Sequence, residues 1–185
     1  MRRNRPSIFR GLVTGITAGI VATLVMDQFQ KLSTAGQRAI ERQKKLADHQ
    51  SPWQIAHEQV QKELAEAEQE DSTEIVARRI AEATGTHLPP EGKKKAGRAV
   101  HYAFGTLMGV VYAVSAEVAP EVTTGAGAAF GTLLFLSADE VAVPAFDLSP
   151  TPSDTHPFDH LQHWASHVVY GGSLEMVRNL ITRLM

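Results

Sequence analysis

The sequence predicts an all-α protein: a four-helix transmembrane bundle with a water-facing helical insert between the first and second spans. Three observations predict this fold. Charged residues are unevenly distributed, four apolar segments lie between or beside the charged stretches, and small or polar residues recur every four positions along each segment. Long uncharged stretches are typical of helices that cross a bilayer, whereas buried helices of soluble bundles usually keep a charged stripe. A soluble bundle of four buried helices is the alternative.

The same pattern divides the chain into three parts. We expect residues 1–30 to hold a cytoplasmic N-terminus and the first transmembrane helix. Residues 31–97 would form the polar helical insert, and residues 98–185 a three-helix membrane segment that completes the bundle. The average composition, with 43% hydrophobic and 21% charged residues and a mean hydropathy of −0.14, conceals this division because it resembles an ordinary soluble domain.

The first apolar segment runs from Gly11 to Met26 without a charged residue and follows four arginines within the first ten residues. A basic flank before an apolar run is also typical of a signal peptide. However, no convincing small-residue cleavage site follows the run directly, and the chain continues into the charged Asp27. We therefore expect an uncleaved membrane helix.

The insert contains eleven Lys or Arg and eleven Asp or Glu between Lys31 and Gly97. Ser51-Pro52-Trp53-Gln54 fits a capping box, which predicts a helix starting at Pro52. Its apolar residues recur at helical spacing, at Trp53, Ala56, Val60 and Leu64. Ser72 is a candidate cap for a second, shorter helix that ends at Gly85, and residues 87–92 read as a linker.

The other three apolar segments cover about residues 99–119, 122–146 and 160–185. Their uncharged stretches, of about 15 to 18 residues, sit at the lower edge of the length that crosses a hydrocarbon core of about 30 Å. The arginines near the N-terminus favour a cytoplasmic start, and four spans then return the C-terminus to the cytoplasm. Lys93, Lys94 and Lys95 point the other way, but they end a long loop in which the positive-inside rule loses force.

A spacing of four residues recurs on every span. The four series are Gly11, Gly15, Gly19, Thr23 and Asp27; His101, Gly105, Gly109, Ala113 and Glu117; Thr123, Gly127, Gly131, Phe135 and Asp139; and His163, His167, Gly171, Glu175 and Asn179. Positions four apart share one helix face. Glycine at this spacing lets two membrane helices approach closely, so we expect glycine-zipper packing with the polar files turned inward.

Every series also carries a carboxylate near the C-terminal end of its helix, where the helix dipole and desolvation both disfavour a negative charge. With alternating span directions, Asp27 and Asp139 fall in one layer together with His101, and Glu117 and Glu175 fall in the other. Arg178 lies one turn after Glu175 and is the expected partner of that carboxylate.

Three histidines of the last segment share one helix face, namely His160, His163 and His167. With Asp27, His101 and Asp139 they could hold a metal ion such as zinc, iron or manganese. Histidines on facing helices could instead ligate a haem. A proton-responsive cluster is a third reading, since imidazole titrates near neutral pH. Hydrogen bonding at the headgroup boundary is the fourth, and we expect no cofactor.

Composition and motifs exclude several classes of protein. The net charge of −2 argues against electrostatic nucleic-acid binding. The absence of cysteine excludes disulfide scaffolds, thiolate zinc sites and cysteine nucleophiles. The sequence contains no nucleophile elbow, no Walker loop, and no Rossmann fingerprint after a strand, so we expect no enzyme and no catalytic residue.

Parts of the C-terminal half resemble the YagU-like family of bacterial inner-membrane proteins. The similarity is carried by the second-span run His101 to Pro120, by the segment 143–150 and by the run His167 to Arg178. Its most specific elements are a His…Ala-Glu-x-x-Pro pairing and a His…Glu-x-x-Arg ending. The resemblance covers roughly His101 to the C-terminus and the general character of the first span, and it does not extend to the insert.

The resemblance implies a multi-span bacterial inner-membrane protein of undefined activity, with a suggested link to acid tolerance. We therefore expect a non-enzymatic helix bundle in the lipid bilayer with a buried His/carboxylate network, tuned by pH at its outer histidines. A small proton or metal-ion channel or transporter is one alternative. The other is an accessory subunit of a larger membrane complex, and a homo-oligomer is a further option.

Overall fold

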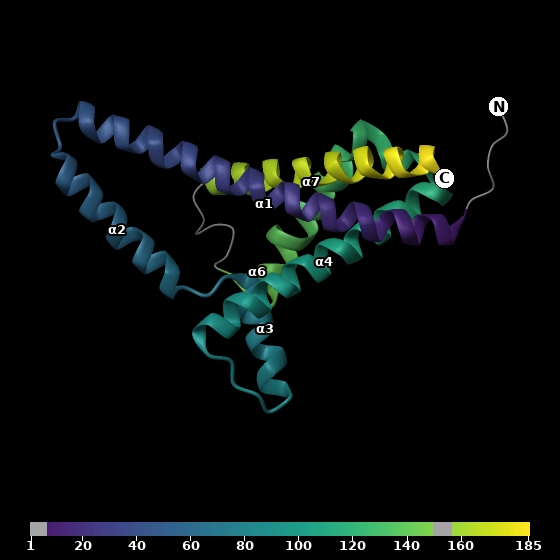
Figure 1. Ribbon diagram of the computed structural model, residues 1–185, viewed down its shortest axis with the longest axis horizontal. Coiled ribbons are helices and arrows are strands. Elements are labelled where there is room, and N and C mark those ends of the chain that lie inside the picture. The colour runs from purple at the N-terminus through teal and green to yellow at the C-terminus, as the bar shows by residue number, and fades with distance from the viewer. Residues whose placement is uncertain (1–6, 150–156) are drawn as a thin grey trace.

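The described chain is entirely helical. The computed structural model describes residues 7–149 and 157–185, and within these ranges no strand is present. The elements are α1 (Ile8–Ala47), α2 (Pro52–Glu68), α3 (Ser72–Ala83), α4 (Pro90–Val118), the 3₁₀ helix η1 (Pro120–Gly127), α5 (Ala128–Leu134), the π-helix η2 (Phe135–Ala142), α6 (Val143–Ala145) and α7 (Pro157–Leu184) (Figure 1).

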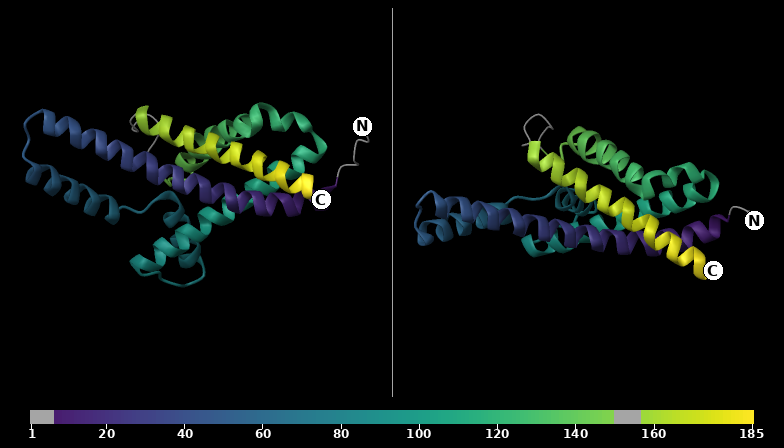
Figure 2. Two further views of the ribbon diagram at one scale, coloured as in Figure 1. Left: turned by 45° about the horizontal axis from the view of Figure 1, so that its top comes forward. Right: turned by 90° about the horizontal axis from the view of Figure 1, so that it is seen from above.

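Helix α1 is the centre of the arrangement. It packs against both α4 and α7, while α7 also packs against α5 and α3 packs against the start of α4. Helix α4 contacts η1 but makes few contacts with α5 and η2. The beginning of α1 and the end of α7 lie at the same end of the bundle, which we call the terminal end (Figures 1 and 2). The opposite end, where α4 and α7 begin, is the insert end.

Within the described ranges, three helical segments are long and apolar enough to cross a membrane: Ile8–Ala47, Pro90–Val118 and Pro120–Ala145. These agree with the first three predicted spans, and the fourth is not among them. The charged and polar residues of α7 lower its mean hydropathy, although α7 lies alongside α1 within the bundle. The all-helical prediction is therefore confirmed, whereas four spans are not.

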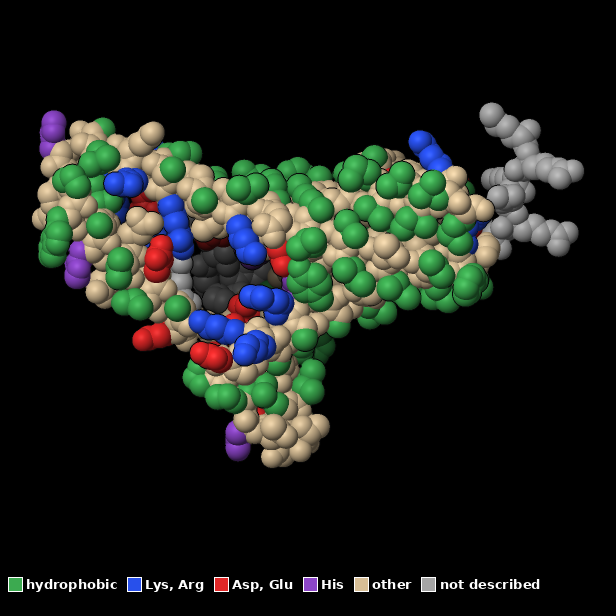
Figure 3. All heavy atoms as spheres, viewed as in Figure 1, with side chains coloured by type: hydrophobic (Ala, Val, Ile, Leu, Met, Phe, Trp, Pro, Cys, Tyr) green, Lys and Arg blue, Asp and Glu red, His purple; other side chains and the backbone are tan. Residues whose placement is uncertain are grey.

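Figure 3 shows how unevenly charge is distributed on the surface. Hydrophobic and uncharged side chains cover the bundle between its two ends, and charged side chains gather around a hollow beside α2 and α3. From Arg10 to Asp27, helix α1 rises about 26 Å at 1.5 Å per residue, close to the hydrocarbon thickness of a bilayer. The remaining half of α1 extends beyond the insert end and pairs with α2 through an Arg38–Glu63 ion pair of 2.9 Å.

The insert follows the sequence prediction at one helix start and departs from it at two. Ser51 and Gln54 form the predicted capping box at the start of α2. The cap of α3 is Asp71 and not Ser72: its carboxylate accepts a hydrogen bond from the backbone N–H of Glu74 at 2.8 Å. Helix α4 begins at Pro90, inside the predicted linker, because proline suits the first position of a helix.

The third apolar segment was expected to be one continuous span, and the structure corrects this. A 3₁₀ helix comes first, and Gly125, Ala126 and Gly127 adopt positive φ angles of 65°, 53° and 86° before α5 begins. The segment then becomes a π-helix from Phe135 to Ala142. Such π-turns are uncommon and often mark functional positions, and here the π-helix carries Asp139.

The predicted glycines lie where helix backbones touch. A methyl group added at Gly19 would lie 2.8 Å from the Cα of Thr106, and one added at Gly109 would lie 2.5 Å from the Cα of Gly19. The other glycines of this α1–α4 seam are Gly11, Gly15 and Gly105. In a second seam, Gly127 and Gly131 of the third segment face the backbone carbonyls of Gly171 and His167 on α7.

Large side chains fill the space that the seams leave between the helix pairs. Tyr112, Tyr170 and Leu174 are almost fully buried, and they pack with Ala18, Ala22, Met26 and Leu134. Small residues therefore form the two seams, and bulky side chains fill the core between them. Polar groups buried in it need hydrogen-bond partners, and every buried side-chain N and O atom among the described residues has one.

Candidate functional site

Polar clusters lie at both ends of the bundle. At the terminal end, Glu117 of α4 meets the start of α1. Its carboxylate accepts hydrogen bonds from the Arg10 Nε at 2.9 Å and from the Ser7 backbone N–H at 3.2 Å. The Glu117 side chain is 5% exposed. The four-residue spacing predicted Glu117 at this end but not its partner Arg10, although the basic flank offered a signal.

Glu175 of α7 is the second carboxylate at the terminal end, and it accepts four hydrogen bonds. The predicted partner Arg178 donates two of them, from Nε and Nη2, each at 2.8 Å. The Tyr112 hydroxyl donates from α4 at 2.8 Å, and the Asn179 amide donates at 2.9 Å. Sequence reasoning missed Tyr112, since tyrosine is common in apolar helices and its partner lies 63 residues away.

Arginine remains protonated at every physiological pH. Each terminal-end carboxylate therefore has a permanent counter-charge in bidentate or near-bidentate geometry, which is the favourable way to bury a carboxylate. These contacts join α1 to α4 and α4 to α7. Chemically, the terminal end is suited to holding helices together.

At the insert end, Asp27 of α1 faces the start of α4. Its two carboxylate oxygens contact the His101 Nε2 at 3.1 Å and accept a hydrogen bond from the Tyr102 hydroxyl at 3.0 Å. Asp27 and His101 come from the first and second predicted files, and the structure places them side by side. Tyr102 was not singled out in the sequence, because it lies outside the four-residue spacing.

A second group at the insert end joins the π-helix to α7. The Asp139 Oδ2 lies 3.4 Å from the His163 Nδ1 and 3.6 Å from the His167 Nδ1. The His167 Nδ1 also lies 3.0 Å from the His163 carbonyl oxygen, so in the neutral ring this nitrogen carries the proton. His160 contacts Glu140, the neighbour of Asp139, with an Nδ1 to Oε1 distance of 2.6 Å.

The two insert-end groups line one cavity of about 650 Å³. Asp27 and His101 lie on its α1 and α4 side, while Asp139, His163 and His167 lie on its η2 and α7 side. Tyr170, whose hydroxyl donates to the Gly105 carbonyl, lies on its wall as well. The outer layer predicted from the sequence is thus two carboxylate–imidazole groups around a shared space, and no ion pair joins the two groups in the described parts of the chain.

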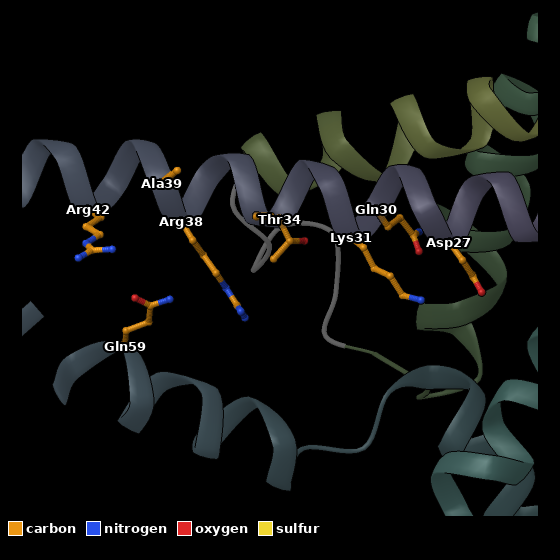
Figure 4. A pocket seen from close by; sticks show the side chains of 9 residues that line it. Asp27, Gln30, Lys31, Thr34, Arg38, Ala39, Arg42 and Gln59 are labelled. Atoms are coloured by element: carbon orange, nitrogen blue, oxygen red, sulfur yellow. The ribbon is translucent and has the colours of Figure 1, made fainter. Parts of the chain in front are cut away.

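A second, more open hollow of about 580 Å³ adjoins this cavity between α1 and α2. Figure 4 shows Lys31 and Arg38 extending from α1 into the space, and Arg42 facing Gln59 of α2 across it. Asp27 borders both spaces. This hollow brings the aqueous surface of the insert close to the insert-end carboxylates.

The described residues do not assemble the metal site that was one reading of the histidine face. Among residues 7–149 and 157–185, no group of three or more histidines and carboxylates is arranged to hold a metal ion. The three candidate residues split between two carboxylates, because His160 contacts Glu140 and the other two histidines contact Asp139. The imidazoles that share one helix face therefore do not share one ligand position.

An ionic cluster outside the bundle fixes the insert to α4. Glu70 accepts hydrogen bonds from Lys93 and from the Arg78 Nε, the latter at 2.8 Å. The pKa of the Glu70 carboxyl is lowered, first by the hydrogen bond from Lys93 and then by that from Arg78. Because Lys93 belongs to the first turn of α4, this cluster connects α3 to the second candidate span.

The fold and these two ends define a helical protein with the features of a membrane bundle. Residues 86–176 match the model of a family described as a protein of unknown function, DUF1440. The match covers α4 to most of α7, and it includes His101, Glu117 and Glu175 but not α1. No curated protein matches the chain, and no solved structure does.

Proposed function

We propose that the chain is a non-enzymatic, multi-pass protein of the bacterial inner membrane whose insert end responds to pH. In this proposal α7 crosses the bilayer as the fourth helix, since it runs alongside α1 from one end of the bundle to the other. Both termini then lie in the cytoplasm. The resemblance to the YagU-like family supports the inner-membrane placement and a role in acid tolerance.

One observation carries the proposal: each of the three carboxylates that join helices at the insert end contacts at least one imidazole. Asp27 faces His101, Asp139 faces His163 and His167, and Glu140 faces His160. Imidazole is the side chain that changes charge between about pH 5 and 8. Protonation of an imidazole places a positive charge beside the carboxylate that it contacts and makes a hydrogen bond between them charge-assisted.

The sign of the effect follows from the two kinds of group. Imidazole gains its charge as the pH falls through the range from about 8 to 5, in which carboxylates are ordinarily ionised, so imidazolium and carboxylate can coexist in the acid part of that range. The added attraction is present in that window and is lost as the pH rises above it. Acidification would therefore tighten the contacts of α1 with α4 and of η2 with α7. Other groups also face these side chains. The Tyr102 hydroxyl donates a hydrogen bond to Asp27, and the charges of Asp159 and His160 interact with His163.

The test is the thermal stability of the purified protein in detergent at pH 5.5 and 7.5. We expect the melting temperature to be about 2–4 °C higher at pH 5.5, which corresponds to about 1 kcal/mol for a chain of this size. The triple variant Asp27→Asn, Asp139→Asn, Glu140→Gln should lose this difference. The proposal would be contradicted if the triple variant kept the same difference in melting temperature between pH 5.5 and 7.5, or if the unaltered protein showed no such difference.

The channel or transporter alternative requires a polar route between the two ends. The insert-end cavity is lined by none of the terminal-end residues Arg10, Glu117, Glu175 or Arg178. Proton or metal-ion flux into liposomes would nevertheless favour this alternative over a bundle without transport activity. Flux that disappears on replacing His163 and His167 would assign it to the insert end.

A role as an accessory subunit is favoured by a specific feature of α2. Its predicted apolar stripe is exposed and does not pack against α1: Trp53, Val60 and Leu64 are 74%, 51% and 55% exposed. Exposed apolar stripes of this kind often mark docking surfaces. A stoichiometric partner that co-purifies in mild detergent and is lost on Trp53→Ala would support this role. Purification as a monomer would count against both this role and the homo-oligomer.

A further inference from the structure

The cavity at the insert end is a wedge between α4 and the third helical segment. Near the terminal end α4 contacts η1, and the Tyr112 and Phe130 rings pack with their centroids 4.9 Å apart. Toward the insert end α4 makes few contacts with α5 and η2, and both sides line the same space of about 650 Å³. The gap between α4 and the third helical segment is therefore closed at the terminal end, where α4 contacts η1, and open at the insert end.

The walls of the wedge are largely apolar and reach its outer surface. Phe104 of α4 and Leu134 of α5 face the cavity. Phe104 is exposed and Leu134 is buried. Phe146 also lines the cavity and is 65% exposed. Because Phe104 belongs to a candidate span, the opening beside it lies at the depth of lipid chains when the bundle is in a bilayer.

The aqueous rim of the cavity carries cations that lack a carboxylate partner. Lys94 and Arg98 lie one turn apart on α4, line the cavity, and form no ion pair with any described residue. Lys31 and Arg42 line the adjoining hollow and also form none within the described ranges. Figure 3 shows Lys and Arg side chains around the hollowed part of this face.

The carboxylates that face the same space are mostly engaged. Asp27 and Asp139 are held by imidazoles, and Asp71 caps α3 through its Oδ1. Glu74 is the remaining one, and its Cγ lies against the backbone at Gly97. Carboxylates outnumber Lys and Arg on the lining, and Lys94 and Arg98 are the cations that remain available to a ligand. Basic residues near a membrane surface attract anionic headgroups, by about 1 kcal/mol per residue.

We propose that this cavity binds an anionic membrane phospholipid. Lys94 and Arg98 would contact the phosphate of the headgroup, and the first part of an acyl chain would lie against Phe104 and Leu134. The remainder of the chain would leave through the opening between α4 and η2. The volume is in the range of small-molecule sites. The inference rests on the proposed membrane placement but not on the proposed response to pH.

The apolar walls select a lipid over a free anion. Inorganic phosphate could use the two cations, but it would leave the wall around Phe104 and Leu134 in contact with water. An amphiphile covers both kinds of surface at once, and burial of each additional methylene group contributes about 0.8 kcal/mol. Lipid and free phosphate are thus distinguishable by experiment.

The experiment titrates the detergent-purified protein with short-chain phosphatidylglycerol, short-chain phosphatidylcholine or inorganic phosphate, and measures bound lipid by native mass spectrometry. We expect phosphatidylglycerol to bind with about one lipid per chain and more tightly than phosphatidylcholine. The double variant Lys94→Gln, Arg98→Gln should bind it at least about tenfold more weakly, because charge-assisted hydrogen bonds are lost. The matched control is Lys95→Gln with Lys44→Gln, which removes the same charge from residues that do not line the cavity.

Three outcomes would overturn the proposal. Equal binding of the two lipids, or equal losses in the two double variants, would indicate non-specific lipid around the bundle. Binding of inorganic phosphate that competes fully with the lipid would indicate a free-anion site. Flotation of the unaltered protein with vesicles tests the membrane placement separately. The pH dependence of the melting temperature tests the proposed function. A failure of either test is therefore distinguishable from a failure of lipid binding.

Discussion

The two ends of the bundle place carboxylates beside different cations. At the terminal end the partners are arginines, and the Glu175 and Arg178 side chains are only 9% and 12% exposed. At the insert end the partners are histidines, and the Asp139 and His163 side chains are 27% and 59% exposed. A permanent cation suits a carboxylate that is shielded from solvent, whereas a partly exposed imidazole can exchange protons with solvent.

This difference assigns separate roles to carboxylates that look alike in the sequence. All four belong to a series of residues spaced four apart that also contains glycine. At the terminal end they join helices at any physiological pH. At the insert end they border a cavity and contact imidazoles, whose charge would change with acid under the proposed function. The predictions below test that division, beginning with the largest expected effect.

Replacing Glu175 by alanine should lower stability the most. The change leaves the Arg178 guanidinium buried without its carboxylate, which typically costs about 3–5 kcal/mol, and it also removes the partner of Tyr112. The loss should be the same at pH 5.5 and 7.5, as measured by thermal melting in detergent. Glu63→Ala, which removes an exposed ion pair with Arg38, is the control and should have little effect.

Replacing Gly109 by leucine should push α1 away from α4 and weaken the contacts between these helices at both ends of the bundle. Overpacking typically costs about 1–3 kcal/mol, and here the added side chain meets the backbone of Gly19 and not a flexible group. Gly36→Ala is the control, because no atom lies within 4 Å of the added methyl group. That variant should gain up to about 1 kcal/mol from helix propensity. Similar melting temperatures for both variants would contradict the close seam.

The two insert-end groups should differ in how strongly they respond to pH. Asp139 faces two imidazoles and Asp27 faces one. Asp139→Asn should therefore reduce the stability difference between pH 5.5 and 7.5 by about twice as much as Asp27→Asn, at roughly 0.5 kcal/mol for each exposed or half-buried pair. The comparison uses melting temperatures of the single variants. A larger effect of Asp27→Asn would reverse this ranking.

The insert should respond to acid in the opposite direction, and with the smallest effect. The lowered pKa of Glu70 means that its bonds to Lys93 and Arg78 stabilise the folded insert above the ordinary glutamate pKa of 4.5. This contribution is lost as the pH falls through the lowered value. Hydrogen exchange of α3 should rise below about pH 4.5, and Glu70→Gln should remove that dependence. Unchanged exchange in acid would show that the cluster does not hold α3.

The local features of the chain were predictable where the signal is contained in a few neighbouring residues. The Ser51–Gln54 capping box and the Glu175–Arg178 pair are examples, since each lies within one helical turn. The partners Arg10 and Tyr112 were missed because helix packing, and not spacing, brings them to their carboxylates. Likewise, three histidines on one helix face suggested a single site, but the facing π-helix offers them two separate carboxylates.

The sequence alone determined that the chain is helical, that its charge is concentrated in an insert and at helix ends, and that carboxylates and histidines carry its polar chemistry. These features depend on periodicity and composition, which are local properties. Only the tertiary structure decided which end received arginine and which received histidine, that the third segment bends into a π-helix, and that α4 diverges from it to leave a cavity. Those outcomes depend on how helices pack over distances of many residues, because glycine seams fix two helix pairs and bulky tyrosines set the space between them.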